Sequence, residues 1–197
     1  MPRRVVKDTF YEKAKKEGFR ARSIYKLEEM QQRFTLIKKG DRVLDLGAAP
    51  GSWLQLESVL AGKSGLIVGL DILPVTPLRA SNVVVKKADI REVDVQALLR
   101  ETSIPAFDVV TSDIAPNLSG LREVDLARMH ELYEAVLMIA DVGLARGGNL
   151  LVKLFFSPDF ADAAAAFKVR FSKVATFKPK ASRSVSDEVY LVGLGKR

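Results

Sequence analysis

The sequence predicts an α/β protein built on a doubly wound, mostly parallel sheet. Three observations lead to this fold class. From residue 42 onward, short apolar runs alternate with helical patterns, which is the signature of repeated βα units. Most of these runs lack the in-out alternation of a half-buried strand, as expected for strands covered on both faces. The length of 197 residues suits one domain with a substantial core.

The apolar runs and the segments between them define the individual elements. Strand-like runs rich in Val, Ile and Leu occupy 42–48, 65–71, 82–90, 107–115 and 148–156. Helical patterns occupy 52–62, 94–101, 123–145 and 158–170. The chain closes with strand-like runs at 171–179 and 188–196, whose connection is too short for a helical crossover. We therefore expect seven strands, with an antiparallel last strand.

Two short helices are expected before the sheet, over residues 8–17 and 21–34. On the second helix, Ile24, Leu27 and Phe34 share one side, and Arg22, Lys26, Glu29 and Arg33 share roughly the opposite side. That pattern alone favours a solvated charged face. Because no repeats or linkers are visible, we expect a single domain, 1–197, composed of a basic helical extension (1–41) and a core (42–197).

Positive charge is concentrated at the two ends of the chain. The formal net charge is +7 and the sequence pI is about 9.6. Residues 1–41 carry a net charge of +6, residues 42–167 carry −5, and residues 168–197 carry +6. If the two ends meet in the fold, they form a rim that suits a polyanion.

Composition excludes several kinds of chemistry. With no cysteine and one histidine, the chain cannot form a disulfide framework, a cysteine nucleophile or a Cys/His zinc site, and we expect no metal. The first residues lack the apolar stretch of a signal peptide, and no run is long enough to cross a membrane. The sequence therefore predicts a cytoplasmic protein in a reducing compartment.

The sharpest local signal is VLDLGAAPGSW, in which a buried strand ends at Asp45 and is followed by Gly47, Gly51 and a helix. In a doubly wound fold this turn faces the ligand crevice, where glycines allow close approach to the backbone. Asp71 ends the next strand, where a carboxylate can accept hydrogen bonds from a ribose. An adenine dinucleotide and S-adenosylmethionine both satisfy this arrangement.

Glycine spacing favours S-adenosylmethionine. The turn departs from the G-x-G-x-x-G pattern of dinucleotide sites, and Pro50 lacks an amide that a pyrophosphate would use. Asp89, which closes the third strand, is then placed to accept from the adenine amino group. Alternatives stay open: Asp45 and Asp71 as turn or cap residues, Asp89 as a helix start, and Trp53 as packing or as a wall of the site.

Five motifs in order, RSIYKLEEMQQ, DLGAAPGSW, SDIAPNLSG, the lysine of LLVKLF and SDEVYLV, resemble the FtsJ/RrmJ family of S-adenosylmethionine-dependent RNA 2′-O-methyltransferases over about residues 7–196. The resemblance implies a Rossmann-like class I methyltransferase fold. It places a catalytic Lys-Asp-Lys-Glu tetrad on Lys26, Asp113, Lys153 and Glu188. It places cofactor contacts on Gly51, Trp53, Asp71, Asp89 and Asp113.

The sequence departs from the family pattern in two places. Ser52 stands where the family usually has glycine, a small change at the start of a helix. After Lys153 the chain continues Leu154-Phe155-Phe156-Ser157-Pro158 instead of a Phe-Gln-Gly type turn. The second departure leaves the rim of the substrate cleft, and with it the target RNA, less defined than the reaction.

Methyl transfer to a ribose hydroxyl is an in-line displacement that needs alignment and a base. We assign the base to Lys153, because burial and nearby cations favour the neutral form of a lysine. Asp113 is expected to orient Lys153, and Glu188 to position Lys26, which holds the acceptor oxygen or a phosphate. The plain alternatives are a Lys153 that reaches solvent, an Asx-turn at Asp113 and a polar strand start at Glu188.

The expected substrate is RNA, because DNA lacks the 2′-hydroxyl. The resemblance implies a uridine of large-subunit ribosomal RNA, free or within the large ribosomal subunit, methylated by a monomer. The alternatives are the tRNA anticodon loop and a catalytically lapsed RNA-binding or assembly factor. A nicotinamide-dependent reductase is disfavoured by the glycine spacing. Since Lys26 and Glu188 lie in opposite basic ends, one site requires those ends to converge.

Overall fold

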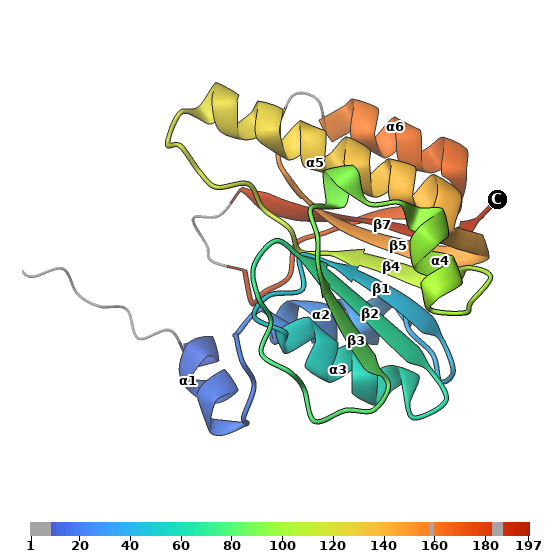
Figure 1. Cartoon of the computed structure of the whole chain (residues 1–197). Coiled ribbons are helices and arrows are strands. Elements are labelled where there is room, and N and C mark those ends of the chain that lie inside the picture. Colours follow the sequence, from blue (N-terminus) through green and yellow to red (C-terminus); the bar gives the residue numbers. More distant parts are fainter. Residues whose placement is uncertain (1–8, 158–159, 183–186) are drawn as a thin grey trace, which may run out of the picture.

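The computed structural model describes residues 9–157, 160–182 and 187–197, and within them the chain forms one seven-stranded sheet (Figure 1). The strand order is β3-β2-β1-β4-β5-β7-β6. Strands β1 to β5 pair in parallel, and β7 runs antiparallel to both of its neighbours. The predicted sheet and its antiparallel last strand are confirmed. The strands are β1 (Arg42–Leu46), β2 (Leu66–Asp71), β3 (Val83–Lys87), β4 (Phe107–Ser112), β5 (Leu144–Phe155), β6 (Phe171–Phe177) and β7 (Glu188–Lys196).

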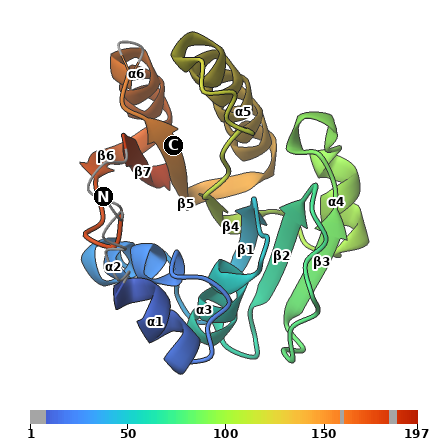
Figure 2. The same cartoon turned by 90° about the vertical axis from the view of Figure 1, so that its left-hand side faces the viewer.

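Helices cover both faces of the sheet (Figure 2). One face carries α2 (Ile24–Phe34) and α3 (Ser52–Ala61), with α1 (Thr9–Lys16) beyond them, and the other carries α4 (Val95–Glu101), α5 (Arg122–Gly143) and α6 (Phe160–Arg170). Strands β1, β2 and β4 are consequently buried almost throughout, whereas the edge strand β3 is half-exposed. Burial from both sides is the reason that the central strands show no alternation in sequence. None of the helices in the described ranges is long and apolar enough to cross a bilayer.

Several elements begin or end at other residues than expected, and for two of them the structure shows the reason. Strand β3 ends at Lys87 rather than at residue 90, because the Asp89 side chain accepts the amide of Arg91 and starts a 3-10 helix, Ile90–Glu92. Strand β5 begins at Leu144 rather than at residue 148. Leu144 already pairs with Phe107, and the register then shifts before Asn149 pairs with Val109.

The sheet divides the apolar core into two layers. Leu44, Val110 and Leu150 pack with the α4–α6 face, and Val43, Val109 and Leu151 pack with the α2–α3 face. Side chains two residues apart in a strand point to the same face. Positions 45, 111, 113 and 153 therefore continue the α2–α3 side toward the carboxyl ends of the strands.

Candidate active site

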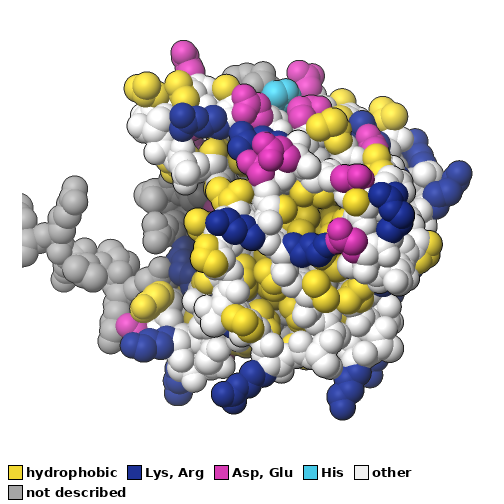
Figure 3. Space-filling model, viewed as in Figure 1, with side chains coloured by type: hydrophobic (Ala, Val, Ile, Leu, Met, Phe, Trp, Pro, Cys, Tyr) yellow, Lys and Arg dark blue, Asp and Glu magenta, His cyan; other side chains and the backbone are white. Residues whose placement is uncertain are grey.

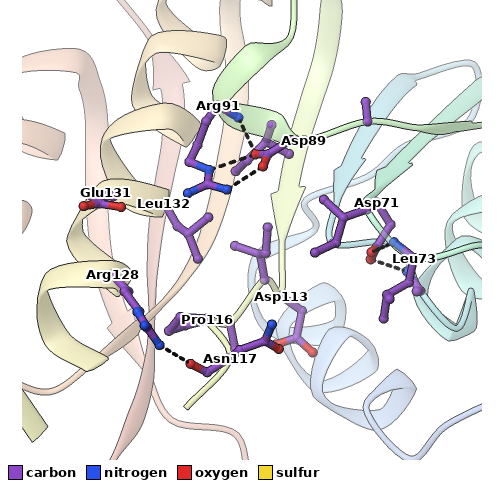
Figure 4. A pocket seen from close by; sticks show the side chains of 17 residues that line it. Asp71, Leu73, Asp89, Arg91, Asp113, Pro116, Asn117, Arg128, Glu131 and Leu132 are labelled. Carbon is purple, nitrogen blue, oxygen red and sulfur yellow. Dashed lines mark hydrogen bonds and ion pairs between the residues drawn. The ribbon is translucent and has the colours of Figure 1, made fainter. Parts of the chain in front are cut away.

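A cavity of about 610 Å³ opens at the carboxyl ends of β1 to β4 (Figure 4). Its volume lies within the range typical of small-molecule sites. The strand-end carboxylates of Asp71, Asp89 and Asp113 line it from three sides. Side chains of α5, including Arg128, Glu131 and Leu132, close the side opposite Asp71 (Figure 4). On the face seen in Figure 3, hydrophobic side chains gather in the middle, with charged side chains around them.

The glycine turn beside this cavity is packed closely against neighbouring protein atoms. Gly47 has φ +82°, and a Cβ there would lie 2.9 Å from the Cα of Ile114. Gly51 has φ +100°, and a Cβ there would lie 2.6 Å from Nη1 of Arg20. Both positions therefore need glycine for backbone conformation and for packing. Gly47 lines the cavity, whereas Pro50 and Gly51 are not among its lining residues.

Asp71 both fixes the turn and faces the cavity. Its Oδ2 accepts the Ala49 amide at 2.8 Å, and its Oδ1 accepts the Leu73 amide at 2.7 Å. Each carboxylate oxygen can accept a second hydrogen bond. The structural and ligand-binding interpretations of Asp71 are thus compatible, because two acceptor positions remain.

Asp89 is held by Arg91 at the far side of the cavity. The guanidinium donates from Nε to Oδ1 at 2.9 Å and from Nη2 to Oδ2 at 2.5 Å (Figure 4). These hydrogen bonds lower the pKa of Asp89 to about 2. At neutral pH the carboxylate is ionised and acts only as an acceptor. Such a group suits an amino donor such as that of adenine.

Next to the cavity, two lysines form close ion pairs with two carboxylates. Lys26 Nζ lies 2.6 Å from Oε1 of Glu188, and Lys153 Nζ lies 3.0 Å from Oδ1 of Asp113 and also donates to the Asp113 carbonyl. Lys26 is 8% exposed and Lys153 is 6% exposed. Helix α2 and strands β5 and β7 supply Lys26, Lys153 and Glu188, and Asp113 directly follows β4. The structure therefore corrects the interpretation of Lys26 as part of a solvated charged face.

Tyr190 joins the two ion pairs and was not found from the sequence. Its hydroxyl donates to Oδ1 of Asp113 at 2.6 Å, and the Lys26 ammonium lies 5.8 Å from its ring centroid. In the sheet, Tyr190 stands opposite Lys153. The available signal was its position two residues after Glu188, which places both side chains on one face of β7.

Charge in this cluster is balanced and largely withdrawn from water. Burial acts to raise the pKa of Glu188, but its hydrogen bond with Lys26 and the charges of Lys26 and Lys153 outweigh burial and hold it below its usual value. The ionised carboxylate in turn holds Lys26 in place. The arrangement leaves Lys153 beside Asp113, which lines the cavity.

Asp45 lies beneath the site rather than in the cavity lining. It is 1% exposed, and its Oδ1 is 3.4 Å from the Thr111 hydroxyl, which donates at 2.8 Å to Glu57 of α3. Burial raises the pKa of Asp45 well above its usual value, and the nearby Glu57 adds to this effect. Burial likewise raises the pKa of Glu57 to about 8. Glu57 was missed, although a lone acid within the apolar helix pattern at 52–62 was a visible signal.

Trp53 and Ser52 connect α3 to α2. The Trp53 indole donates to the Ser23 carbonyl at 2.9 Å, and its ring centroid lies 6.3 Å from that of Tyr190. Trp53 does not contribute to the cavity lining, so its observed contacts are those of a packing residue. The Ser52 hydroxyl lies 2.9 Å from that of Ser23. The departure at position 52 thus adds a tie between the helices and leaves the turn intact.

A doubly wound sheet with a glycine turn and a cavity at its carboxyl edge defines a Rossmann-like α/β protein, and its strand-end acidic residues suit a nucleoside-containing ligand. Two lysine-carboxylate ion pairs lie beside that cavity. The comparisons specify the family. The FtsJ-like methyltransferase family model matches residues 19–196, and the chain belongs to that family.

Similar proteins agree with this assignment. Proteins named ribosomal RNA large subunit methyltransferase E from Bdellovibrio bacteriovorus and Syntrophobacter fumaroxidans are each 43% identical to this chain, over 97% and 98% of it and 97% of each relative. A crystal structure from Plasmodium falciparum, described as a ribosomal RNA methyltransferase, matches with a TM-score of 0.80 and 27% identity over 90% of this chain and 98% of that one.

Proposed function

We propose that this protein transfers a methyl group from S-adenosylmethionine to a ribose 2′-hydroxyl of large-subunit ribosomal RNA. The observation that carries the proposal is the buried Lys26–Glu188 and Lys153–Asp113 cluster beside a cavity lined by strand-end carboxylates. The relatives named above are large-subunit ribosomal RNA methyltransferases, which supports this choice of RNA over a tRNA. An intact tetrad argues against a lapsed enzyme.

The cavity suits S-adenosylmethionine by shape and by the chemistry of its donors and acceptors. Asp71 would accept from the ribose hydroxyls and Asp89 from the adenine amino group, since both carboxylates keep acceptor capacity toward the cavity. Gly47 and Asp113 border the remaining part of the cavity. When bound, S-adenosylmethionine supplies a methyl group activated by a positively charged sulfur.

In the proposed mechanism Lys153 removes the proton of the attacking hydroxyl. Asp113 orients the ammonium through its carboxylate and its carbonyl, and it shares the carboxylate with the Tyr190 hydroxyl, which limits its attraction for Lys153. Lys26, held by Glu188, is placed to bind the acceptor oxygen or an adjacent phosphate. Alignment by these fixed groups provides the larger part of the acceleration, with proton removal adding to it.

The test is transfer of labelled methyl groups to total RNA, then to separated ribosomal RNA, large ribosomal subunits and tRNA, with mapping of the modified ribose. Replacing Lys153 by alanine should abolish transfer and leave S-adenosylmethionine affinity within a few fold. Lys168→Ala, an exposed lysine on α6, is the matched control. Full activity of Lys153→Ala would remove the assigned base, and label in tRNA alone would redirect the substrate.

We further propose that the protein acts as a cytoplasmic monomer. No sequence feature predicts a partner copy, and the tetrad is assembled from a single chain. Sedimentation of the protein with and without RNA tests the stoichiometry.

A further inference from the structure

Phe156 is an exposed aromatic side chain at the end of the strand that carries Lys153. It is 63% exposed, and among the phenylalanine, tyrosine and tryptophan residues that the structure describes only Tyr11 is also more than half exposed. Phe156 directly follows β5, in the segment where the sequence departs from the family pattern. A single exposed apolar residue is ordinary on a protein surface, so the case for a role rests on where Phe156 lies and on how its ring is held.

The residue is exposed but held in a defined position. Its amide donates to the Asp187 carbonyl at 2.8 Å, and its ring packs against that of Phe160, with centroids 5.5 Å apart. The Asp187 carboxylate is in turn 3.6 Å from the Arg122 guanidinium at the start of α5. Backbone and ring are thus supported from β7 and α6, which leaves the outer part of the ring as a fixed apolar surface.

Position in the sheet relates this surface to the tetrad. Phe155, the preceding residue, pairs with Glu188, and Lys153 lies three residues back along β5. At about 3.3 Å per residue the backbone of Phe156 is roughly 10 Å from that of Lys153, in the direction of the carboxyl edge. Lys153 faces the α2–α3 side and the Phe156 ring packs toward α6, so a base of a nucleotide whose 2′-hydroxyl reaches Lys153 would meet the ring by extending over the end of β5.

We propose that Phe156 is a stacking platform for a base of the RNA substrate, at or next to the methylated nucleotide. The proposal rests on the proposed function, because it assumes that RNA reaches Lys153. Single-stranded RNA is commonly bound by stacking its bases on aromatic rings, and removing such a ring weakens binding roughly 5- to 150-fold. Stacking fixes the base without selecting its identity, so Phe156 positions the nucleotide while hydrogen bonds elsewhere select it.

The test compares Phe156→Ala and Phe156→Trp with Met138→Ala, which removes an exposed apolar side chain from α5. We expect Phe156→Ala to raise the KM for RNA at least about 5-fold, Phe156→Trp to keep it near the wild-type value, and Met138→Ala to change nothing. Calorimetric affinity for S-adenosylmethionine should be unchanged in all three variants. An equal KM for wild type and Phe156→Ala would overturn the proposal.

A second arm identifies what the ring contacts. RNAs with an abasic site at the target nucleotide, or on either side of it, should bind wild type more weakly at one position, and Phe156→Ala should lose that discrimination. If Phe156→Ala methylates naked RNA normally but assembled ribosomal subunits poorly, Phe156 contacts a ribosomal protein instead, and base stacking is overturned. If the wild-type protein methylates no RNA, the proposed function is refuted instead. The two failures are distinguishable because the abasic-site experiment measures RNA binding and not methyl transfer.

Discussion

Replacing Glu57 by glutamine should change how the stability of the protein depends on pH. Glu57 is fully buried on α3, its Oε1 accepts the Thr111 hydroxyl, and its Oε2 has no hydrogen-bond partner in the described structure. Its neighbour Asp45 likewise has one unpartnered oxygen, Oδ2. One hydroxyl cannot satisfy two buried carboxylates, so the folded protein favours their protonated forms.

The magnitude follows from the pKa of Glu57, which burial raises from 4.5 to about 8. Because the folded-state pKa lies above the unfolded one, the stabilisation is fully present below about pH 4.5 and is lost as the pH rises to about 8. At about 1.4 kcal/mol per pKa unit, the free energy of unfolding should fall by roughly 3 kcal/mol between pH 5 and pH 8. Asp45, whose pKa is also raised by burial, acts in the same direction.

Urea unfolding at several pH values between 5 and 8 measures this slope. Glu57→Gln should reduce the slope and stabilise the protein at pH 8, whereas the exposed Glu92→Gln should retain the wild-type slope. A wild-type stability that stays constant across this range, or an equal slope in Glu57→Gln, would refute the reasoning.

Three further predictions concern ligand binding. Asp71→Ala should weaken S-adenosylmethionine binding at least about tenfold by calorimetry, because it removes a hydrogen-bond acceptor from the cavity and the two hydrogen bonds that hold the turn. Unchanged affinity would exclude Asp71 from the ribose position. The Arg20 guanidinium ties the glycine turn to the loop after β2 by donating to the carbonyls of residues 50, 76 and 77. A single ammonium cannot replace these three hydrogen bonds, so Arg20→Lys should raise the KM for S-adenosylmethionine several-fold. A wild-type KM would show that this tie does not support the cofactor site. Arg33→Glu, exposed on α2, should raise the KM for RNA and spare cofactor binding, whereas Arg146→Glu, at the amino end of β5, should not; equal effects would indicate no specific surface.

The order of the elements was predictable because it depends on local patterns. Apolar runs between helical segments gave five parallel strands, and a short connection gave the antiparallel pair. What could not be predicted were boundaries set by tertiary contacts. Strand β3 stops where Asp89 caps a 3-10 helix, and β5 starts early because Leu144 finds a partner in Phe107.

The site shows the same division between local and long-range information. Asp71 and Asp89 were predicted because strand ends meet at one edge of a parallel sheet. The side-chain pattern of α2 was misleading for Lys26, because a charge on a polar face is buried when another element supplies its partner. Tyr190 and Glu57 were missed because their partners, Asp113 and Thr111, come from distant parts of the chain.

The same long-range contacts bring the two basic ends of the chain together. The first basic segment reaches the last through the Lys26–Glu188 ion pair and through Glu29, which accepts the amides of Lys180 and Ala181 at 2.9 Å each. The predicted convergence of the ends is therefore confirmed. Within the tetrad each lysine is neutralised by its own carboxylate, so the cluster adds little net charge of its own. The excess charge of the two ends must then act outside the tetrad, which is where an RNA backbone would pass while one ribose enters.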